Sequence, residues 1–296
     1  MVTRDAFATC QRLAREHYEN FPVASWLMPA AARPHIAAVY AFARIADDFA
    51  DEGVRGPGER LALLANWQDR LDAAAQGRVE QTGNSTHDAV FVALCETLKA
   101  FRTAHGPLGD LLSAFRQDVS TKRYDTWADV LDYCRRSANP VGRLVLLVTR
   151  HDNDNDALAR RSDAVCTALQ LTNFWQDLAR DWANGRLYVP LDMVQSHGAD
   201  LGDLDRGNWT PQWRAALRDA GTRTKALFDA GRPVADAVHG RLRLELRATW
   251  LGGRRVLDRL AAADYDVFLA RPSLGWRDAA HVAAGAVTWR RSLLTS

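Results

Sequence analysis

Residues 39–52 read VYAFARIADDFADE, a run of small and apolar residues that ends in four acids. The apolar residues recur at helical spacing, so we predict one helix over about residues 32–52. Asp47 and Asp51 are four residues apart and therefore share one face of that helix. Acids at the C-terminal end of a helix oppose the helix dipole, so this cluster costs stability unless a cation compensates it.

A second acidic run lies more than a hundred residues further on, where residues 170–181 read QLTNFWQDLARD. A helix over about residues 156–184 places Asn173, Asp177 and Asp181 on one face. If this face opposed that of the first run, the two would form a cage of oxygen ligands. Such ligands suit magnesium, which is often completed by phosphate oxygens of a substrate. The two runs together predict a magnesium and diphosphate site.

Each acidic run also has an ordinary interpretation as part of a surface. The first could be a solvated helix end before Gly53, and the second a charged stripe in which Arg180 pairs with its neighbours. Leu171, Phe174 and Trp175 make that second stripe narrow. The presence of both runs in one chain favours the metal site.

The composition is that of an ordinary folded protein. The chain has 296 residues, of which 47% are hydrophobic and 25% charged, and its formal net charge is +2. This charge argues against a protein that binds nucleic acid electrostatically, so no nucleic-acid partner is expected. Cys10, Cys95, Cys134 and Cys166 form no zinc-binding or disulfide pattern, which indicates a reducing compartment.

The N-terminal residues carry charges throughout, where a secretory signal would need an apolar core. No window approaches the roughly 20 apolar residues of a membrane span. We therefore expect a cytoplasmic protein. Peripheral contact with the inner face of the membrane stays open, because a protein that handles an apolar substrate can rest on a membrane surface.

Helical periodicity runs through almost the whole chain, and alternating strand patterns are absent, so the sequence predicts an all-α protein with about ten helices. Thr126 with Asp129 matches a capping box. No break is long or biased enough for an interdomain linker, so residues 1–296 are predicted to form a single domain. Breaks are predicted where Gly, Pro, Asn and Asp collect, at residues 21–22, 28–29, 53–58, 77–86, 106–107, 124–126, 151–156, 185–208 and 271–275.

Both acidic runs resemble the two aspartate-rich motifs of the squalene and phytoene synthase family, and residues 185–190, GRLYVP, resemble the stretch that follows the second motif. The order and spacing agree over about residues 10–265. The resemblance implies a helical bundle of the class I isoprenoid type, like trans-prenyltransferases and terpene synthases, with a central apolar cavity. It also implies magnesium and a prenyl diphosphate substrate.

Two further phrases resemble one branch of the family, whose members convert presqualene diphosphate to hydroxysqualene. These are residues 19–25, ENFPVAS, and residues 133–143, YCRRSANPVGR. We expect Pro140 to kink the helix in which it lies. The resemblance implies a carbon–oxygen lyase that releases diphosphate, serves squalene or hopanoid supply and needs no nicotinamide cofactor. Channelling from a synthase of presqualene diphosphate stays open.

The resemblance also assigns residue roles. The metal ligands would be Asp47, Asp48, Asp51, Asn173, Asp177 and Asp181, with Asp48 as an additional or indirect ligand. Arg44 and Arg180 would meet phosphate oxygens, although surface ion pairs are the alternative for both. The residues expected to donate to the leaving group, line the chamber or place a water are Tyr40, Tyr133, Asn139, Arg143 and Gln170. For Asn139 a turn or cap role is equally compatible, and Arg143 could simply reach the surface.

Two alternative functions remain at this point. A condensing member of the same family would make presqualene diphosphate, squalene or phytoene from prenyl diphosphates. A non-catalytic helical subunit would keep the fold but is expected to lose its acids, and here both acidic runs are intact.

Overall fold

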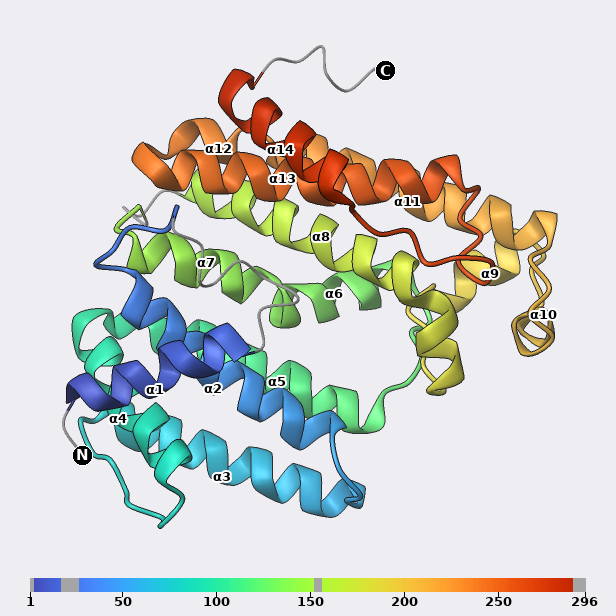
Figure 1. Ribbon diagram of the computed structural model, residues 1–296. Helices are drawn as coiled ribbons and strands as arrows, with labels where there is room; N and C mark the ends of the chain where they lie inside the picture. The colour runs from blue at the N-terminus through green and yellow to red at the C-terminus, as the bar shows by residue number, and fades with distance from the viewer. Residues whose placement is uncertain (1–2, 17–26, 152–155, 290–296) are drawn as a thin grey trace. The chain divides into compact units, whose positions relative to one another are not determined.

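The computed structural model describes residues 3–16, 27–151 and 156–289, and in these ranges it is all helical, as the sequence predicts (Figure 1). The one β-type contact in these ranges is an isolated bridge between Arg123 and Leu187. Internal contacts divide the chain into two compact units. Unit 1 comprises residues 1–121 and 140–155, and unit 2 comprises residues 122–139 and 156–296. Each unit is described by itself, and the single-domain organisation stays a prediction.

Unit 1 is built from helices that start and stop at recognisable signals. Pro34 and Pro57 stand in the first turns of α2 and α3, where a missing backbone N–H costs nothing. The Asn84 side chain caps α4 by accepting from the His87 backbone N–H. The elements are α1 (Thr3–Glu16), α2 (Arg33–Asp51), α3 (Pro57–Ala75), α4 (Ser85–Ala100), the 3-10 helix η1 (Arg102–Ala104), α5 (His105–Ser120) and all but the first residue of α7 (Asn139–Val148).

An aromatic cluster around Trp67 of α3 forms the core of unit 1. The Trp67 ring stacks on Phe42 at 5.8 Å between centroids and meets Phe91 edge-on at 4.6 Å. Its indole N–H donates to the Phe42 carbonyl at 3.2 Å. Phe49, seven residues after Phe42 on the same face of α2, also meets Trp67 at 5.2 Å. These contacts fix the face of α2 that is buried, and thereby the face that carries the acids.

Unit 2 contains the second acidic motif, on the long helix α8. Its elements are α6 (Trp127–Ser137), α8 (Asp156–Ala183), α9 (Leu191–Ser196), α10 (Leu201–Asp205), α11 (Pro211–Gly231), α12 (Val234–Ala237), α13 (Gly240–Ala262) and α14 (Trp276–Thr288). Helix α8 packs against α6, α11 and α13. The Trp175 indole N–H of α8 donates to the Thr224 hydroxyl of α11 at 2.9 Å, inside this packing.

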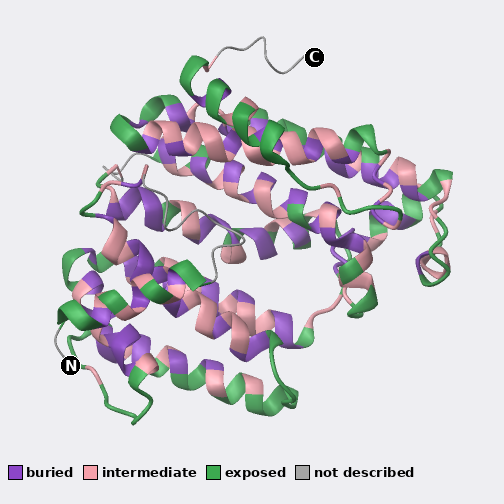
Figure 2. Ribbon diagram, in the orientation of Figure 1, coloured by how far each residue is buried: buried purple, intermediate pink, exposed green. Residues whose placement is uncertain are grey.

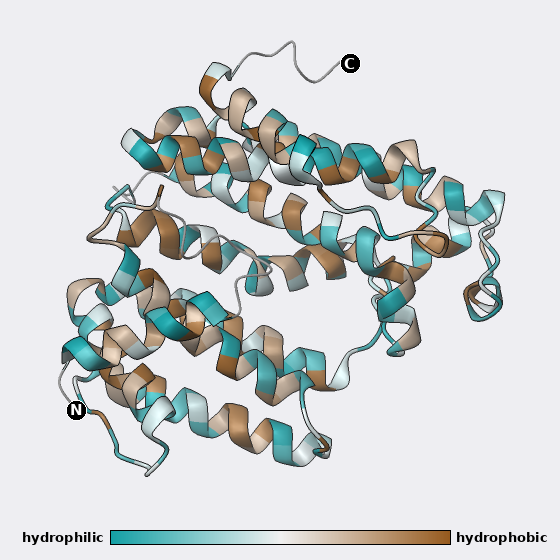
Figure 3. Ribbon diagram, in the orientation of Figure 1, coloured by the Kyte–Doolittle hydropathy of each residue, from teal (hydrophilic) through white to brown (hydrophobic). Residues whose placement is uncertain are grey.

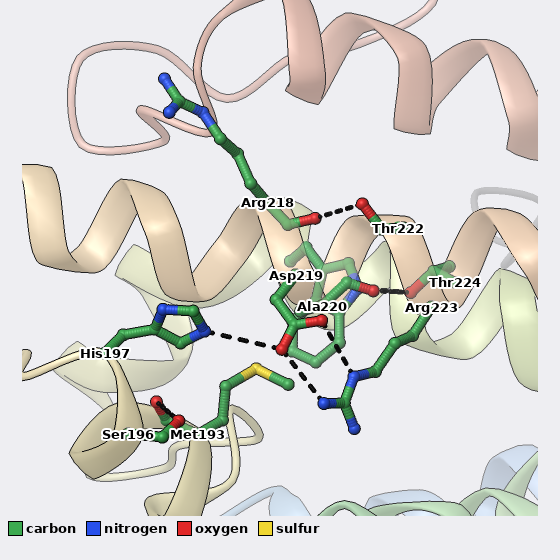
Figure 4. A network of polar contacts seen from close by, with 10 residues as sticks. Met193, Ser196, His197, Arg218, Asp219, Ala220, Thr222, Arg223 and Thr224 are labelled. Atoms are coloured by element: carbon green, nitrogen blue, oxygen red, sulfur yellow. Dashed lines mark hydrogen bonds and ion pairs between the residues drawn. The ribbon is translucent and has the colours of Figure 1, made fainter.

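Burial follows hydropathy along most helices. Helix α7 is an example: Leu144 to Val148 are all buried, and Figures 2 and 3 show the helix largely purple and brown. A polar network lies where the end of α9 meets α11 (Figure 4). There Asp219 accepts from the Arg223 guanidinium at 3.0 and 3.1 Å and lies 3.5 Å from His197. These contacts, with the hydrogen bonds from Arg223 first, outweigh burial and hold the pKa of Asp219 below its ordinary value.

Glycine allows α8 and α11 to approach closely. A Cβ atom at Gly231 would lie 2.8 Å from the Arg161 carbonyl oxygen and 2.9 Å from the Val165 backbone nitrogen. Because both are backbone atoms, the helices would have to separate. We expect Gly231→Ala to lower the free energy of unfolding by about 1–3 kcal/mol in urea titrations. The control Gly109→Ala, inside α5 with no atom within 4 Å of the new Cβ, should be neutral or stabilising.

Most predicted breaks in the described residues lie between helices, and the Thr126–Asp129 capping box is confirmed. The predicted break at residues 106–107 is wrong, because these residues lie in the first turn of α5, and the described residues form fourteen α-helices rather than about ten. Residues 185–208 are not one break, since they include α9 and α10. The predicted kink at Pro140 is wrong: α6 ends at Ser137, and Pro140 lies in the first turn of α7, where its missing N–H breaks no bond. Residues 19–25, which were predicted to contain a break, lie outside the described residues.

Candidate active site

The first acidic motif surrounds one arginine at the end of α2. The Arg44 guanidinium lies 3.4 Å from Asp47, 2.7 Å from Asp48 and 2.7 Å from Glu52. These residues share a face because they follow Arg44 by three, four and eight positions. Helix α2 stops at Asp51, before Gly53, whose φ of +76° suits glycine. The motif is therefore a half-exposed group of carboxylates that one guanidinium partly neutralises.

Tyr40 lies one turn before Arg44 and is half-buried. Burial raises the pKa of its phenol above the ordinary value; Arg44 lowers it, and Asp47 and Asp48 raise it further. The side chain thus keeps its proton at neutral pH and is able to donate a hydrogen bond. This supports the predicted position of Tyr40 near the acidic face of α2.

The second acidic motif centres on Asp177 of α8, whose side chain is 9% exposed. Asn173, one turn earlier, donates to Asp177 Oδ2 at 2.8 Å, as their spacing predicts. Arg271 donates to Asp177 Oδ1 at 2.5 Å and to Oδ2 at 3.3 Å. A bidentate pair of this kind is a strong way to hold a carboxylate. Asp181 follows in the last turn of the same helix and is half-buried.

Arg271 belongs to the segment between α13 and α14, which is fastened to its surroundings at several points. Gln176 of α8 donates to the Pro272 carbonyl, and Arg259 of α13 donates to the Ser273 carbonyl. The sequence of residues 271–275 predicts only a helix break. A contact between residues 94 positions apart leaves no periodic signal, so nothing local in the sequence indicates that Arg271 meets Asp177.

Four aromatic side chains gather next to the second motif. Phe174 of α8 stacks on Tyr188 at 3.7 Å between centroids, with the rings almost parallel. Tyr133 of α6 lies 6.0 Å from Phe174 and 5.5 Å from Tyr124. Phe174 is three residues before Asp177, so α8 carries a polar, anionic group and an aromatic group within one turn. Sequence reasoning singled out Tyr133 and did not select Tyr124 or Tyr188.

The remaining predicted residues have different surroundings. Asn139 is buried, and its side-chain oxygen accepts from the Thr167 hydroxyl of α8 at 2.8 Å, a contact within unit 2. Gln170 is half-buried on α8, three residues before Asn173, whereas Arg143 and Arg180 are exposed. Their predicted roles stay predictions.

The donor set of both motifs fits a hard divalent cation, because it consists of carboxylates and one amide oxygen. Within the part of the chain that the structure describes, no three histidine, cysteine, aspartate or glutamate side chains converge as a ready metal site. Arginines are instead paired with the acids of both motifs. That the two acidic faces oppose each other also stays a prediction.

Comparison with known proteins identifies the family. The model of the squalene/phytoene synthase family matches residues 14–278. The chain belongs to this family. A hydroxysqualene synthase of Zymomonas mobilis is 40% identical over 75% of the chain and 71% of that relative. A hydroxysqualene synthase of Sinorhizobium fredii is 34% identical over 85% of the chain and 82% of that relative.

Solved structures of family members have the same fold. The crystal structure of a squalene synthase from Alicyclobacillus acidocaldarius matches with a TM-score of 0.81 and 39% identity, over 89% of this chain and 95% of that one. A dehydrosqualene synthase solved in complex with a ligand matches with a TM-score of 0.83 and 21% identity, over 97% of each chain. This family member therefore has the class I isoprenoid synthase fold. None of its described helices is both long and apolar enough to cross a bilayer.

Proposed function

We propose that this family member converts presqualene diphosphate and water to hydroxysqualene and diphosphate. The observation that carries the proposal is the similarity to hydroxysqualene synthases, three of which are 34–40% identical over 75–85% of the chain. The chain also carries both acidic motifs, with Asp47, Asp48 and Asp51 in the first and Asp177 and Asp181 in the second.

The local arrangement on α8 supports this chemistry. Asn173 and Asp177 form the polar side of the proposed site, where the diphosphate would leave, and Arg271 beside them carries a positive charge. One turn away, the Phe174, Tyr133, Tyr188 and Tyr124 rings provide faces that attract a cation. A diphosphate that ionises to a carbocation needs these two environments next to each other.

Magnesium would be held by Asp47, Asp48, Asp51, Asn173, Asp177 and Asp181, as the family resemblance implies. When bound, it supplies positive charge that stabilises diphosphate as a leaving group. Arg44 and Arg271 add guanidinium donors that match phosphate oxygens. Tyr40 has a raised pKa, so on the α2 side it would keep its phenolic proton and be able to donate a hydrogen bond.

The proposed reaction balances without an oxidant or a reductant. The carbon–oxygen bond to diphosphate breaks, and both electrons leave with the diphosphate. The cyclopropylcarbinyl cation that remains rearranges to an allylic cation. The oxygen of water then forms the new carbon–oxygen bond and loses one proton. The product therefore carries one oxygen atom from solvent.

A second candidate is squalene synthesis from farnesyl diphosphate. It is favoured by the squalene synthase of Alicyclobacillus acidocaldarius, which is 39% identical and covers 89% of the chain. This reaction would need a hydride donor for its last step, and its product would contain no oxygen. The two candidates therefore differ in substrate, in reductant and in the mass of the product.

The test is incubation of the purified full-length protein with magnesium and either presqualene diphosphate or farnesyl diphosphate, each with and without NADPH. In water enriched in ¹⁸O, we expect presqualene diphosphate alone to give hydroxysqualene that is heavier by two mass units. Turnover of farnesyl diphosphate alone, or formation of squalene that depends on NADPH, would reject the proposal in favour of a condensing enzyme.

Arg271 competes with a cation for the oxygens of Asp177, which yields a separate prediction. Because the pair is partly exposed, its loss in Arg271→Ala should tighten binding of Mn²⁺ to the substrate-free protein roughly two- to fivefold. The measurement is a titration followed by the electron paramagnetic resonance of free Mn²⁺. Arg271→Lys, which keeps the charge, is the control. An unchanged affinity in Arg271→Ala would show that the pair does not compete with the cation.

A further inference from the structure

Helix α14 carries an uncharged face that is exposed to solvent. Its buried residues are Asp278, Gly285 and Ala286, and the helix packs on α13. There Asp278 lies 3.0 Å from Arg255 and 2.7 Å from Arg259. A surface helix usually buries its apolar side and exposes its charges. In α14 the acid is on the buried side.

The exposed side forms a continuous stripe. Trp276, Ala280, Ala283 and Val287 follow one another at intervals of four, three and four residues, so they line one face of α14, and all four are exposed. We call this face, with Leu274 of the preceding segment, the α14 stripe. Its two largest exposed members are far from buried, since Trp276 is 77% exposed and Val287 71%. Figure 2 shows α14 mostly in the colour of exposed residues.

Apart from the buried Asp278, the charged residues of α14 and of the sequence that follows it are basic. Arg277 stacks on the Trp276 ring at 5.2 Å, and the described residues include no ion-pair partner for it. From Ala279 to Ser296 the sequence contains no acidic residue and adds Arg290 and Arg291. A stripe that combines tryptophan, aliphatic residues and arginine matches the boundary between acyl chains and anionic headgroups.

The size of the α14 stripe favours a bilayer over a second protein chain. Three exposed side chains and two alanines offer on the order of 400 Å², whereas a stable protein interface needs about 800 Å² from each partner. A bilayer accommodates a small patch, since a few side chains suffice for reversible attachment. We propose that the α14 stripe docks this protein on the surface of an anionic bilayer. The docking proposal rests on the proposed function in one respect: a water-insoluble product is the reason for contact with a bilayer.

The test is cosedimentation of the full-length protein with vesicles, without substrate. Vesicles of phosphatidylcholine with phosphatidylglycerol should pellet the protein at low salt, and vesicles of phosphatidylcholine alone should pellet roughly five- to twentyfold less. The double variant Trp276→Gln/Val287→Ser should lose about tenfold in binding to the anionic vesicles. The matched control is Val54→Ser, which changes a still more exposed valine in unit 1 and should bind like the wild type.

Three outcomes would overturn the docking proposal. These are no binding to anionic vesicles at low salt, equal binding by the double variant, and a wild-type dimer that the double variant converts to a monomer, which would assign the α14 stripe to a second copy. Thermal unfolding by circular dichroism checks that the double variant is folded. Product formation in detergent micelles is measured separately, so failure of the docking proposal and failure of the proposed function are distinguishable.

Discussion

Asp177→Asn is expected to lower the rate of diphosphate release from presqualene diphosphate by about 10²–10³-fold in kcat/KM. Asparagine keeps the shape of the side chain and removes its negative charge. Asp177 is the buried acid of the second motif, where it binds both Asn173 and Arg271. The substitution therefore removes a predicted cation ligand and leaves the Arg271 guanidinium beside a neutral amide. Diphosphate release is followed with a coupled phosphate assay, and hydroxysqualene by mass spectrometry.

The matched control is Asp156→Asn, at the first residue of the same helix. Asp156 is 91% exposed, and its nearest basic group, Arg160, lies 4.0 Å away. This variant should keep wild-type activity, because it makes the same chemical change far along α8 from the motif. Circular dichroism distinguishes loss of the site from loss of the fold. Full activity in a folded Asp177→Asn protein would remove the second motif from the mechanism.

Arg70→Ala is expected to have the largest effect on stability, about 3–5 kcal/mol in the free energy of unfolding. Arg70 and Asp88 are each 4% exposed and lie 2.9 Å apart in the core of unit 1. The guanidinium also covers the Phe91 ring, at 4.1 Å from its centroid. Removing Arg70 leaves a buried carboxylate without its counter-charge and opens a cavity. Urea unfolding at pH 7 measures the loss, and Arg70→Met, which fills the cavity, separates the two causes.

The effect of Arg70→Ala should depend on pH. Burial raises the pKa of Asp88, but hydrogen bonds from the Thr82 backbone and hydroxyl, together with Arg70, outweigh burial and hold the pKa below 3.8. A carboxyl with a lowered folded pKa stabilises the fold above its unfolded pKa and loses this contribution as the pH falls through the folded value. The destabilisation should therefore shrink on acidification below about pH 4. A constant difference between pH 7 and pH 3 would contradict the ion-pair explanation.

An exposed ion pair serves as the control for Arg70→Ala. Lys99 and Glu96 lie 2.7 Å apart on the surface of α4, where water screens both charges. Lys99→Ala should leave the urea midpoint unchanged. A difference between the two variants would show that burial, rather than the short distance, accounts for the contribution of the Arg70–Asp88 pair to the free energy of unfolding.

Local periodicity predicted the two helices that carry the acidic motifs almost to the residue. The expected ranges of about 32–52 and 156–184 are observed as Arg33–Asp51 and Asp156–Ala183. Their boundaries lie at local signals, since Gly53 follows the first helix and Asp156 begins the second. The spacing also predicted that Asn173 would reach Asp177, because residues four apart in a helix are neighbours.

The arginines were harder to predict. The arginine-rich stretch of residues 241–259 has the composition of a solvated helix face, yet Arg254 is 4% exposed and lies between Asp229 and Asp258, at 3.2 and 3.0 Å. Arg255 and Arg259 both form ion pairs with the buried Asp278. Composition alone cannot distinguish a buried arginine from an exposed one. An arginine is buried only where acids from other parts of the chain pack beside its charge.

The sequence by itself determined the helical fold, the family and the positions of both acidic motifs, because helical spacing and short motifs depend on residues that are close in the chain. Only the tertiary structure decided which groups those acids meet, which arginines are buried, and that Tyr124 and Tyr188 join Tyr133 beside Phe174. The physical reason is that these contacts join different elements of the chain, as Asp177 and Arg271 do across 94 positions. Their geometry is set by how whole helices pack, and no local pattern records it.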